Sequence, residues 1–283
     1  MELFKLITEI IKQRKSCRTF EPKPIEKEIL EKITDSLANI TVPFGSKVRF
    51  QLIDISNLPD EESKKLGTYR IIKGAKTFIT GAVVSDSAKC WEDFGYGLEK
   101  IILFATQFEI GTCWLGGTFN RASFSKKINL QPNEILPAIT PIGYPAQKSS
   151  LTDSAIRKMA GSDKRKLWNE LFFKESFNNP LNEAGDETYY QPLSMLRLAP
   201  SASNRQPWRI VKQNNKLHFY LQRTTGYNKL VSVDLQRIDM GIAMCHFELT
   251  AKHIGLKGDW ITETPSVINL LPRTEYIVSW VEK

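Results

Sequence analysis

Two apolar stretches in different parts of the chain share the same glycine spacing, and this feature constrains the fold most. Gly97 and Gly111 lie 14 residues apart, and Gly241 and Gly255 repeat that spacing 144 positions later. Five further positions match at the same offset: Phe94 with Ile238, Leu98 with Ile242, Leu103 with Phe247, Thr106 with Thr250, and Ile110 with Ile254. Any two amphipathic helices can share an apolar register by chance. The shared glycine ends nevertheless favour an internally duplicated chain.

Helix and strand patterns are mixed around the first of these stretches. The periodicity of apolar residues predicts helices over 3–11, 25–37 and 97–110, strands over 48–52 and 77–84, and an extended stretch over 135–142. Because Pro24 opens the second apolar stripe and Glu26 and Glu28 lie in its first turn, they mark a helix start. Residues 1–150 are therefore predicted to form one α+β half.

A polar connector and a second half follow. The connector is predicted over 151–192, with short helical pieces near 154–159 and 165–173. The second half, 193–283, is predicted to contain a helix over 193–198, strands over 209–212 and 217–221, a long helix over 236–253, and two C-terminal strands. The fold class expected is α+β, with two similar halves.

Composition and cysteine spacing narrow the class of protein. Of 283 residues, 41% are apolar and 25% are charged, as in ordinary globular proteins. No stretch is long and apolar enough for a membrane span, and the N-terminus lacks a signal-peptide pattern, so a cytoplasmic protein is expected. The four cysteines are widely spaced and form no C-x-x-C pair: Cys17, Cys90, Cys113 and Cys245. We expect buried, chemically idle thiols and no metal site.

The net charge of +8 indicates an anionic partner. Much of the excess lies in two basic clusters, residues 12–18 and 157–166, which fit either a phosphorylated cofactor or a solvated basic face. Neither cluster interleaves aromatic residues as single-strand binders do, and no recognition helix is apparent, so nucleic acid is not expected. Gly95 and Gly97 imitate part of a dinucleotide fingerprint, but without a third glycine they indicate a helix start.

A polar loop between two prolines is the most specific string. It runs from Leu198 to Trp208 with the sequence L-A-P-S-A-S-N-R-Q-P-W and directly follows a predicted helix. Because proline fixes φ, such a loop can hold hydroxyl and amide groups in set directions toward a planar polar ligand. From the residues alone, a helix C-terminus followed by a turn explains it equally well.

This loop resembles the flavin loop of the FMN-dependent nitroreductases, whose pattern is A-P-S-x-x-N-x-Q-P-W. Three further strings are similar to motifs of that family: R-K-S-C-R-T-F at 14–20, G-T-C-W-L-G-G at 111–117, and G-Y-P at 143–145. The resemblance implies a nitroreductase-like fold in which each half has a mainly antiparallel sheet flanked by helices.

The motifs are divided between the halves. The first half carries R-K-S-C-R but has only A-N-I-T-V-P-F-G-S, residues 38–46, where a flavin loop is expected, whereas the second half carries the full loop and no such start. Family members are usually homodimers that combine both motifs around each FMN. The chain therefore resembles an internally duplicated, single-chain branch, a fused pseudo-dimer with one complete FMN site between its halves and one degenerate site.

The resemblance implies that thirteen residues would lie at the cofactor. Arg14 and Ser16 would bind the FMN phosphate, with Arg165 and Lys166 as a second phosphate clamp. Lys15, Arg18 and Arg70 would lie near the ribityl chain and the pyrimidine edge. The remaining positions would approach the ribityl and isoalloxazine groups: Pro200, Ser201, Ser203 and Asn204 through side chains and loop shape, and Gly116 and Gly117 through exposed backbone. Gln206 and Trp208 would shape the loop.

The chemistry implied is borne by the flavin, so no catalytic side chain is assigned and His218, His246 and His253 receive no role. NAD(P)H would reduce FMN, which would then reduce a small flat acceptor such as a quinone or a nitroaromatic. Two alternatives stay open: a non-catalytic flavin-binding or sensing protein, and another flavin reaction such as dehalogenation or dehydrogenation. The expected partner is a small molecule, not a membrane, and the expected state is a monomeric pseudo-dimer or a weak homodimer.

Overall fold

The chain divides into two compact units, Met1–Ser162 and Asp163–Lys283. The computed structural model describes residues 3, 5–59, 66–69, 71–147, 161, 164–183, 187–225, 233–263, 265–266 and 269–283. The second unit includes residues 163–192, most of the segment that the sequence assigned to a connector. The helical piece predicted near 154–159 lies outside the described residues.

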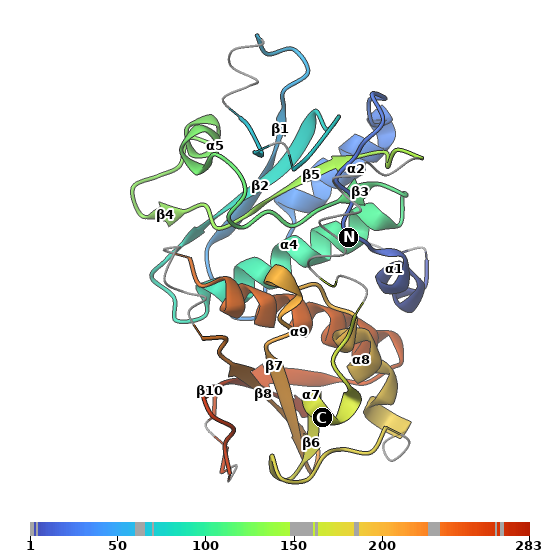
Figure 1. Ribbon diagram of the computed structural model, residues 1–283, viewed down its shortest axis with the longest axis vertical. Helices are drawn as coiled ribbons and strands as arrows, with labels where there is room; N and C mark the ends of the chain where they lie inside the picture. Colours follow the sequence, from blue (N-terminus) through green and yellow to red (C-terminus); the bar gives the residue numbers. More distant parts are fainter. Residues whose placement is uncertain are drawn as a thin grey trace. The chain divides into compact units, whose positions relative to one another are not determined.

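Unit 1 contains an antiparallel sheet with helices around it (Figure 1). Its elements are α1 (Ile7–Gln13), α2 (Lys27–Ala38), β1 (Val48–Asp54), β2 (Thr77–Val84), α4 (Cys90–Thr106), β3 (Gly111–Thr112), α5 (Arg121–Lys127), β4 (Glu134–Ile135) and β5 (Ile139–Gly143). The sheet order is β1-β2-β5-β3, and β4 pairs with β2. Helix α4 is almost wholly buried and packs against β1, β2 and β3, which explains why its sequence is apolar nearly all round.

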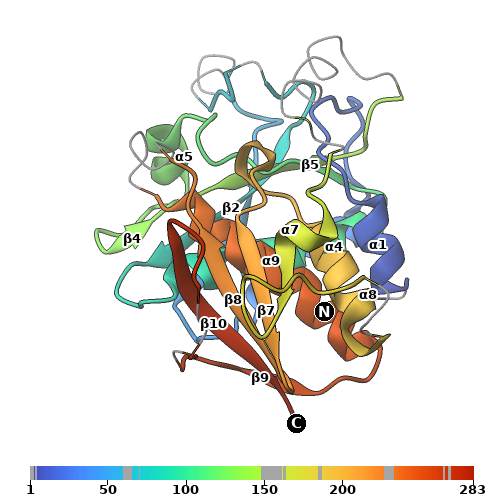
Figure 2. The same ribbon diagram turned by 60° about the horizontal axis from the view of Figure 1, so that its bottom comes forward.

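Unit 2 also contains a sheet with a long buried helix against it (Figure 2). Its elements are α7 (Trp168–Leu171), β6 (Phe172–Lys174), α8 (Glu187–Arg197), the 3-10 turn η1 (Ala202–Asn204), β7 (Trp208–Gln213), β8 (Lys216–Gln222), α9 (Leu235–His253), β9 (Gly258–Ile261) and β10 (Thr274–Glu282). The order is β6-β7-β8-β10-β9, antiparallel except for the parallel pair β6 and β7. In the core, Phe247 of α9 packs against Phe219 of β8 and Trp280 of β10. The ring centroid of Phe247 lies 5.5 Å from that of Phe219 and 5.2 Å from that of Trp280.

The two sheets share one strand order. In unit 1 a hairpin, β1 and β2, leads into the long helix α4, then the edge strand β3, and finally β5, which lies between β2 and β3. Unit 2 repeats this order with β7, β8, α9, β9 and β10. The prediction of an α+β fold with two similar halves, each with a mainly antiparallel sheet, is therefore confirmed.

Several predicted boundaries are wrong. Helix α4 begins at Cys90, so Gly95 and Gly97 lie inside it and do not mark its start. Glu92 and Asp93 are acidic, which is typical of a segment outside an apolar helix, but both are buried in the first turn of α4. The extended stretch predicted at 135–142 is divided between β4 and β5, and the helical piece predicted at 165–173 contains only α7 before β6 begins.

Two other predictions from composition can be compared with the structure. All four cysteines are buried as thiols, as expected. No helix among the described residues is long and apolar enough to cross a membrane.

Candidate functional site

In unit 1, the N-terminal motif lies beside the motif at 111–117. Ser16 forms a parallel bridge with Thr112, and the Cys17 amide donates a 2.7 Å hydrogen bond to the Thr112 carbonyl. Gly111 permits this approach, because a Cβ at that position would lie 2.9 Å from Cys17 Cβ. Two strings that are almost 100 residues apart in sequence are therefore neighbours.

The Gly-Tyr-Pro motif joins the same cluster. Phe20 forms an antiparallel bridge with Pro145, the Glu21 amide donates to the Tyr144 carbonyl at 2.9 Å, and the Ala146 amide donates to the Thr19 carbonyl at 3.0 Å. All three family-like motifs of the first half thus converge within unit 1. We call residues 14–20, 111–117 and 143–145 the unit 1 cluster.

Glu99 links two of these motifs, and the sequence analysis did not identify it. Its side chain is fully buried on α4; Oε2 accepts a 2.6 Å hydrogen bond from Trp114 Nε1, and Oε1 lies 3.8 Å from Arg14 Nε. Arg14 Nε is itself buried and has no hydrogen-bond partner among the described residues. The available signal was an acidic residue inside an otherwise apolar helix, since charged groups are rarely fully buried without a partner.

The other predicted residues of unit 1 differ in exposure. Lys15 is exposed, and Ser16 and Arg18 are partly exposed. The Gly116 carbonyl accepts a 2.7 Å hydrogen bond from Arg121 Nη2. A Cβ added at Gly117 would have no atom within 4 Å, so packing does not require glycine there and its backbone is open to a ligand. Arg70 lies outside the described residues.

In unit 2, the loop from Leu198 to Trp208 connects α8 to β7 and is conformationally strained. Ser203, Asn204 and Gln206 have φ near +50°, a region that residues other than glycine rarely adopt. The Gln206 amide donates a 2.8 Å hydrogen bond to Ser201 Oγ, which closes the loop on itself. Ser203 is exposed, while Pro200, Ser201 and Asn204 are partly exposed. The loop therefore presents polar groups from a fixed backbone.

The basic segment 164–166 packs against this loop, as the assignment of both to one ligand requires. Asn204 Nδ2 donates to the Lys164 carbonyl at 2.9 Å, and Arg165 Nη1 lies 3.4 Å from Asn204 Oδ1. The Lys166 amide donates to Gln206 Oε1 at 2.9 Å. Gln206 is buried and shapes the loop, as predicted. We call residues 164–166 and 198–208 the unit 2 cluster.

The unit 2 cluster concentrates positive charge. Burial lowers the pKa of Lys166, and the nearby cations Arg209 and Arg205 lower it further against the opposing effect of Glu170. Arg209 is buried beneath the loop, where it donates to the carbonyls of Gln206 and Trp208 at 3.0 and 2.6 Å, and burial lowers its pKa to about 10. Cations that destabilise one another in this way favour an anionic ligand.

A buried carboxyl group supports the loop from below. Asp239, in α9, accepts a 2.9 Å hydrogen bond from the Ala202 amide through Oδ1, while Oδ2 is buried without a partner among the described residues. Burial raises the pKa of Asp239 well above its ordinary value. The sequence analysis did not identify this residue either, although it too is an acid in an apolar helix.

Comparison with known proteins gives a family and a fold. The model of the family described as "Putative TM nitroreductase" matches residues 6–251. A search of curated proteins gives no match. Among solved structures, a putative nitroreductase from Thermotoga maritima is 19% identical, with a TM-score of 0.62 over 99% of this chain and 95% of that chain.

Other solved structures resemble about half of the chain. One, a nitroreductase with bound FMN from Bacteroides fragilis, is 18% identical with a TM-score of 0.41, over 52% of this chain and 92% of that chain. Another, described as a putative NADH dehydrogenase/NAD(P)H nitroreductase from Bacteroides thetaiotaomicron, is 23% identical with a TM-score of 0.42, over 51% of this chain and 89% of that chain.

Proposed function

The chain belongs to the family described as "Putative TM nitroreductase", and from this premise we propose that it binds one FMN and acts as a flavin oxidoreductase. NAD(P)H is the proposed electron donor, and a small flat molecule such as a quinone or a nitroaromatic is the proposed acceptor. The observation that carries the proposal is the unit 2 cluster, where a strained polar loop meets a group of cations with few acidic neighbours.

The residues present suit the parts of FMN. The phosphate suits the cations Arg165 and Lys166, whose segment is hydrogen-bonded to the loop, and it also suits Arg14 and Ser16 in the unit 1 cluster. The hydroxyl and amide groups of Ser201, Ser203 and Asn204 can donate to or accept from the ribityl chain and the ring edge. Lys15, Arg18 and Arg70 complete the proposed set near the pyrimidine edge, and Pro200 sets the loop's entry.

Backbone exposed at Gly116 and Gly117 completes the proposed ring site. Because Gly117 has no neighbouring atom where a Cβ would stand, the flat face of a ring can approach its backbone closely. When bound, FMN supplies the hydride and electron transfer. The protein then orients the ring, limits water and stabilises negative charge through Lys15 and Arg18, and no side-chain nucleophile is needed.

One FMN per chain is proposed because only one unit has the polar loop. Unit 1 has the hairpin, the long helix and the same strand order as unit 2, but its loop before β1 lacks the serine and asparagine pattern. The shared order supports an origin by internal duplication, in which one copy lost the loop. This division also gives the alternative of a protein that binds flavin without turnover.

Purified protein tests the proposal directly. We expect a yellow protein that releases FMN on denaturation at one equivalent per chain, and whose visible absorbance bleaches on addition of NADH or NADPH. Colourless protein that takes up no FMN on titration would contradict flavin binding. Bound flavin that neither nucleotide reduces would favour the non-catalytic alternative.

Two substitutions test whether both clusters serve one FMN. Arg14→Ala removes a cation of the unit 1 cluster, and Asn204→Ala removes an amide of the unit 2 cluster. Each should weaken FMN binding by about tenfold or more, since one charge-assisted or well-placed hydrogen bond contributes roughly 1.5 kcal/mol. Lys126→Ala, at an exposed position on α5, is the matched control. Unchanged affinity in either test variant would confine the site to the other cluster.

A further inference from the structure

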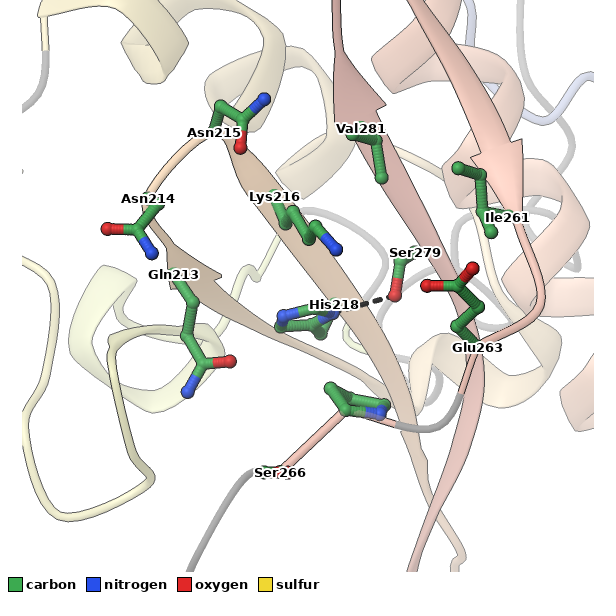
Figure 3. Close-up of a pocket in the computed structure, with 11 residues that line it drawn as sticks. Gln213, Asn214, Asn215, Lys216, His218, Ile261, Glu263, Ser266, Ser279 and Val281 are labelled. Carbon is green, nitrogen blue, oxygen red and sulfur yellow. Dashed lines mark hydrogen bonds between the residues drawn. The ribbon is translucent and has the colours of Figure 1, made fainter.

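A polar pocket lies on the sheet of unit 2, at the opposite end of β7 and β8 from the 198–208 loop (Figure 3). Its volume is about 330 Å³, and it is lined by the turn from Gln213 to Lys216 and by residues of β8, β9 and β10. The strand register explains it. Lys216 pairs with Val281, and His218 with Ser279, so these side chains lie on one face of the sheet. The other face, with Phe219 and Trp280, packs against α9.

A chain of hydrogen bonds at the floor of the pocket fixes the tautomer of the His218 ring. The Tyr276 hydroxyl donates its only proton to the Ile261 carbonyl at 3.1 Å. Ser279 Oγ, 2.8 Å from the Tyr276 oxygen, must therefore be the donor in that pair. Its proton is then used, so Ser279 Oγ accepts from His218 Nδ1 at 2.7 Å. His218 is thus protonated on Nδ1, and Nε2 keeps its lone pair.

This lone pair makes Nε2 a hydrogen-bond acceptor for a ligand. Figure 3 shows the second ring nitrogen pointing away from Ser279, toward the side of the pocket where Gln213 lies. No described residue donates to it, although His218 is almost wholly buried. Burial, aided by the charge of Lys216, lowers the pKa of His218 to about 4, so the ring is neutral at physiological pH.

Opposite charges stand on the rim. Lys216 and Glu263 lie on either side of Ser279 (Figure 3). Two carboxamides form a fixed wall, because Gln213 Nε2 donates to the Glu175 carbonyl at 3.0 Å and Asn215 Nδ2 donates to the Glu282 carbonyl at 2.8 Å. Their oxygens remain acceptors. The pocket thus offers many acceptors and one cation.

We propose that this pocket binds a small zwitterion of the α-amino acid class. The ligand's ammonium group donates to His218 Nε2 and to the carboxamide oxygen of Gln213, which lies on the same side of the ring in Figure 3, and its carboxylate pairs with Lys216. Ile261, Pro265 and Val281 line the pocket and accommodate a short apolar side chain. A volume near the lower limit of ordinary ligand pockets suits one small molecule rather than a dinucleotide. The site does not depend on flavin binding.

L-valine is the probe, and two of its analogues separate the contacts. Isovalerate lacks the ammonium group and isobutylamine lacks the carboxylate, while both keep the branched side chain. We expect L-valine to bind saturably at millimolar concentration and to shift the ¹⁵N resonance of His218 Nε2, with both analogues at least about tenfold weaker. An unchanged Nε2 resonance with L-valine and with glycine overturns the proposal, and so does equal binding of either analogue.

Two substitutions test the same contacts without disturbing the hydrogen bond between His218 and Ser279. Lys216→Met removes the charge partner of the carboxylate, and Gln213→Leu removes one acceptor of the ammonium group, so each should weaken L-valine binding by about tenfold. Lys174→Met, at an exposed position on β6, is the matched control and should bind normally. Normal L-valine affinity in both variants overturns the proposal. FMN content is measured on the same samples and is expected to be unchanged throughout.

Discussion

Each unit has a loop before its first hairpin strand, and an aspartate from the following long helix holds each loop. In unit 1, Asp93 accepts hydrogen bonds from the amides of Phe44 and Ser46 at 2.9 and 2.8 Å, so both carboxylate oxygens are used. In unit 2, Asp239 accepts one hydrogen bond, from Ala202, and its second oxygen is buried without a partner among the described residues. The unit 1 loop therefore uses both oxygens of its aspartate, whereas the unit 2 loop leaves one aspartate oxygen without a described hydrogen-bond partner.

The backbone conformations of the two loops also differ. The unit 1 loop enters the left-handed region at Gly45, with φ of +70°, where glycine has no steric penalty. The unit 2 loop does so at three residues that have side chains. Strain in side-chain-bearing residues persists where the surroundings hold it, and it is commonly found at binding sites. The comparison supports the proposal that only the unit 2 loop serves a flavin site.

The largest expected effect comes from Asp93→Asn. The new amide nitrogen would face a backbone N–H, so one buried donor of the loop loses its acceptor at any pH. We expect the free energy of unfolding to fall by about 3 kcal/mol, measured by urea denaturation. Asp35→Asn, at an exposed position on α2, is the control. A loss of less than about 1 kcal/mol would show that Asp93 does not hold the loop.

Gln206→Ala should rank second. It removes the side chain that accepts from the Lys166 amide and donates to the Lys164 carbonyl, contacts with no counterpart in the described unit 1 loop. We expect a loss of about 2 kcal/mol in unfolding free energy, faster hydrogen exchange at the Lys166 amide and weaker FMN binding. If exchange at Lys166 is unchanged, the basic segment is held by other contacts.

Asp239→Asn should have a smaller effect, and one that depends on pH. Because burial raises the pKa of Asp239, the folded state binds its proton more tightly than the unfolded state does. Wild-type stability from this group is therefore present at low pH and is lost as pH rises above about 4. An asparagine does not ionise, so the Asp239→Asn variant does not lose stability in this way as pH rises.

Unfolding measured from pH 4 to pH 8 checks this prediction. The stability of the Asp239→Asn variant relative to wild type should improve with rising pH, by about 1 to 2 kcal/mol over the range. A constant difference between the two proteins would mean that Asp239 is already ionised in the folded state.

A pair of glycine substitutions should give the smallest effects. The pair separates the cost of a positive φ from the cost of steric contact with a new Cβ. A Cβ added at Gly45 or at Gly117 would have no atom within 4 Å, but only Gly45 has a positive φ. Gly45→Ala should cost about 1 kcal/mol of stability through backbone strain alone. Gly117→Ala should leave stability unchanged and weaken FMN binding. Equal stability losses would show that the described surroundings of Gly117 are not open.

Much of the fold follows from sequence patterns of short range. The apolar run 77–84 coincides with β2, and the alternating and periodic stretches locate β1, β7, β8 and α9 to within a few residues. The short strand β6 was missed, and the helix before it was predicted too long, because the stability of β6 comes from a distant partner. Strand β6 has only three residues and pairs with β7, almost 40 residues later, and a polar sequence around it gives no local signal.

The candidate site is only half readable from sequence, for a physical reason. Motif residues such as Asn204 are candidates because they resemble a family pattern, but Glu99, Asp93 and Asp239, which support the loops and motifs, were missed. Acidic residues are ordinarily exposed, and whether one is buried depends on the amides or indole groups that other segments bring to it. Those partners lie 15 to 49 residues away in sequence.

The shared glycine spacing of the two halves has mixed causes. Gly111 is required by the close approach of Cys17, whereas Gly255 follows the end of α9 with φ of +86°. Equal spacing therefore does not reflect an equal role. The stronger sign of similarity between the halves is the strand order, which the spacing alone could not reveal.

The hairpin of β7 and β8 carries the 198–208 loop at one end and the zwitterion pocket at the other. Five residue steps separate Trp208 at one end from Gln213 at the other, which is about 17 Å at ~3.3 Å per residue. Substitutions that far apart, with no shared partner, usually contribute additively. Selection could therefore have altered one end of this hairpin without disturbing the other, and a rigid ladder of backbone hydrogen bonds would have kept the two sites evolutionarily independent.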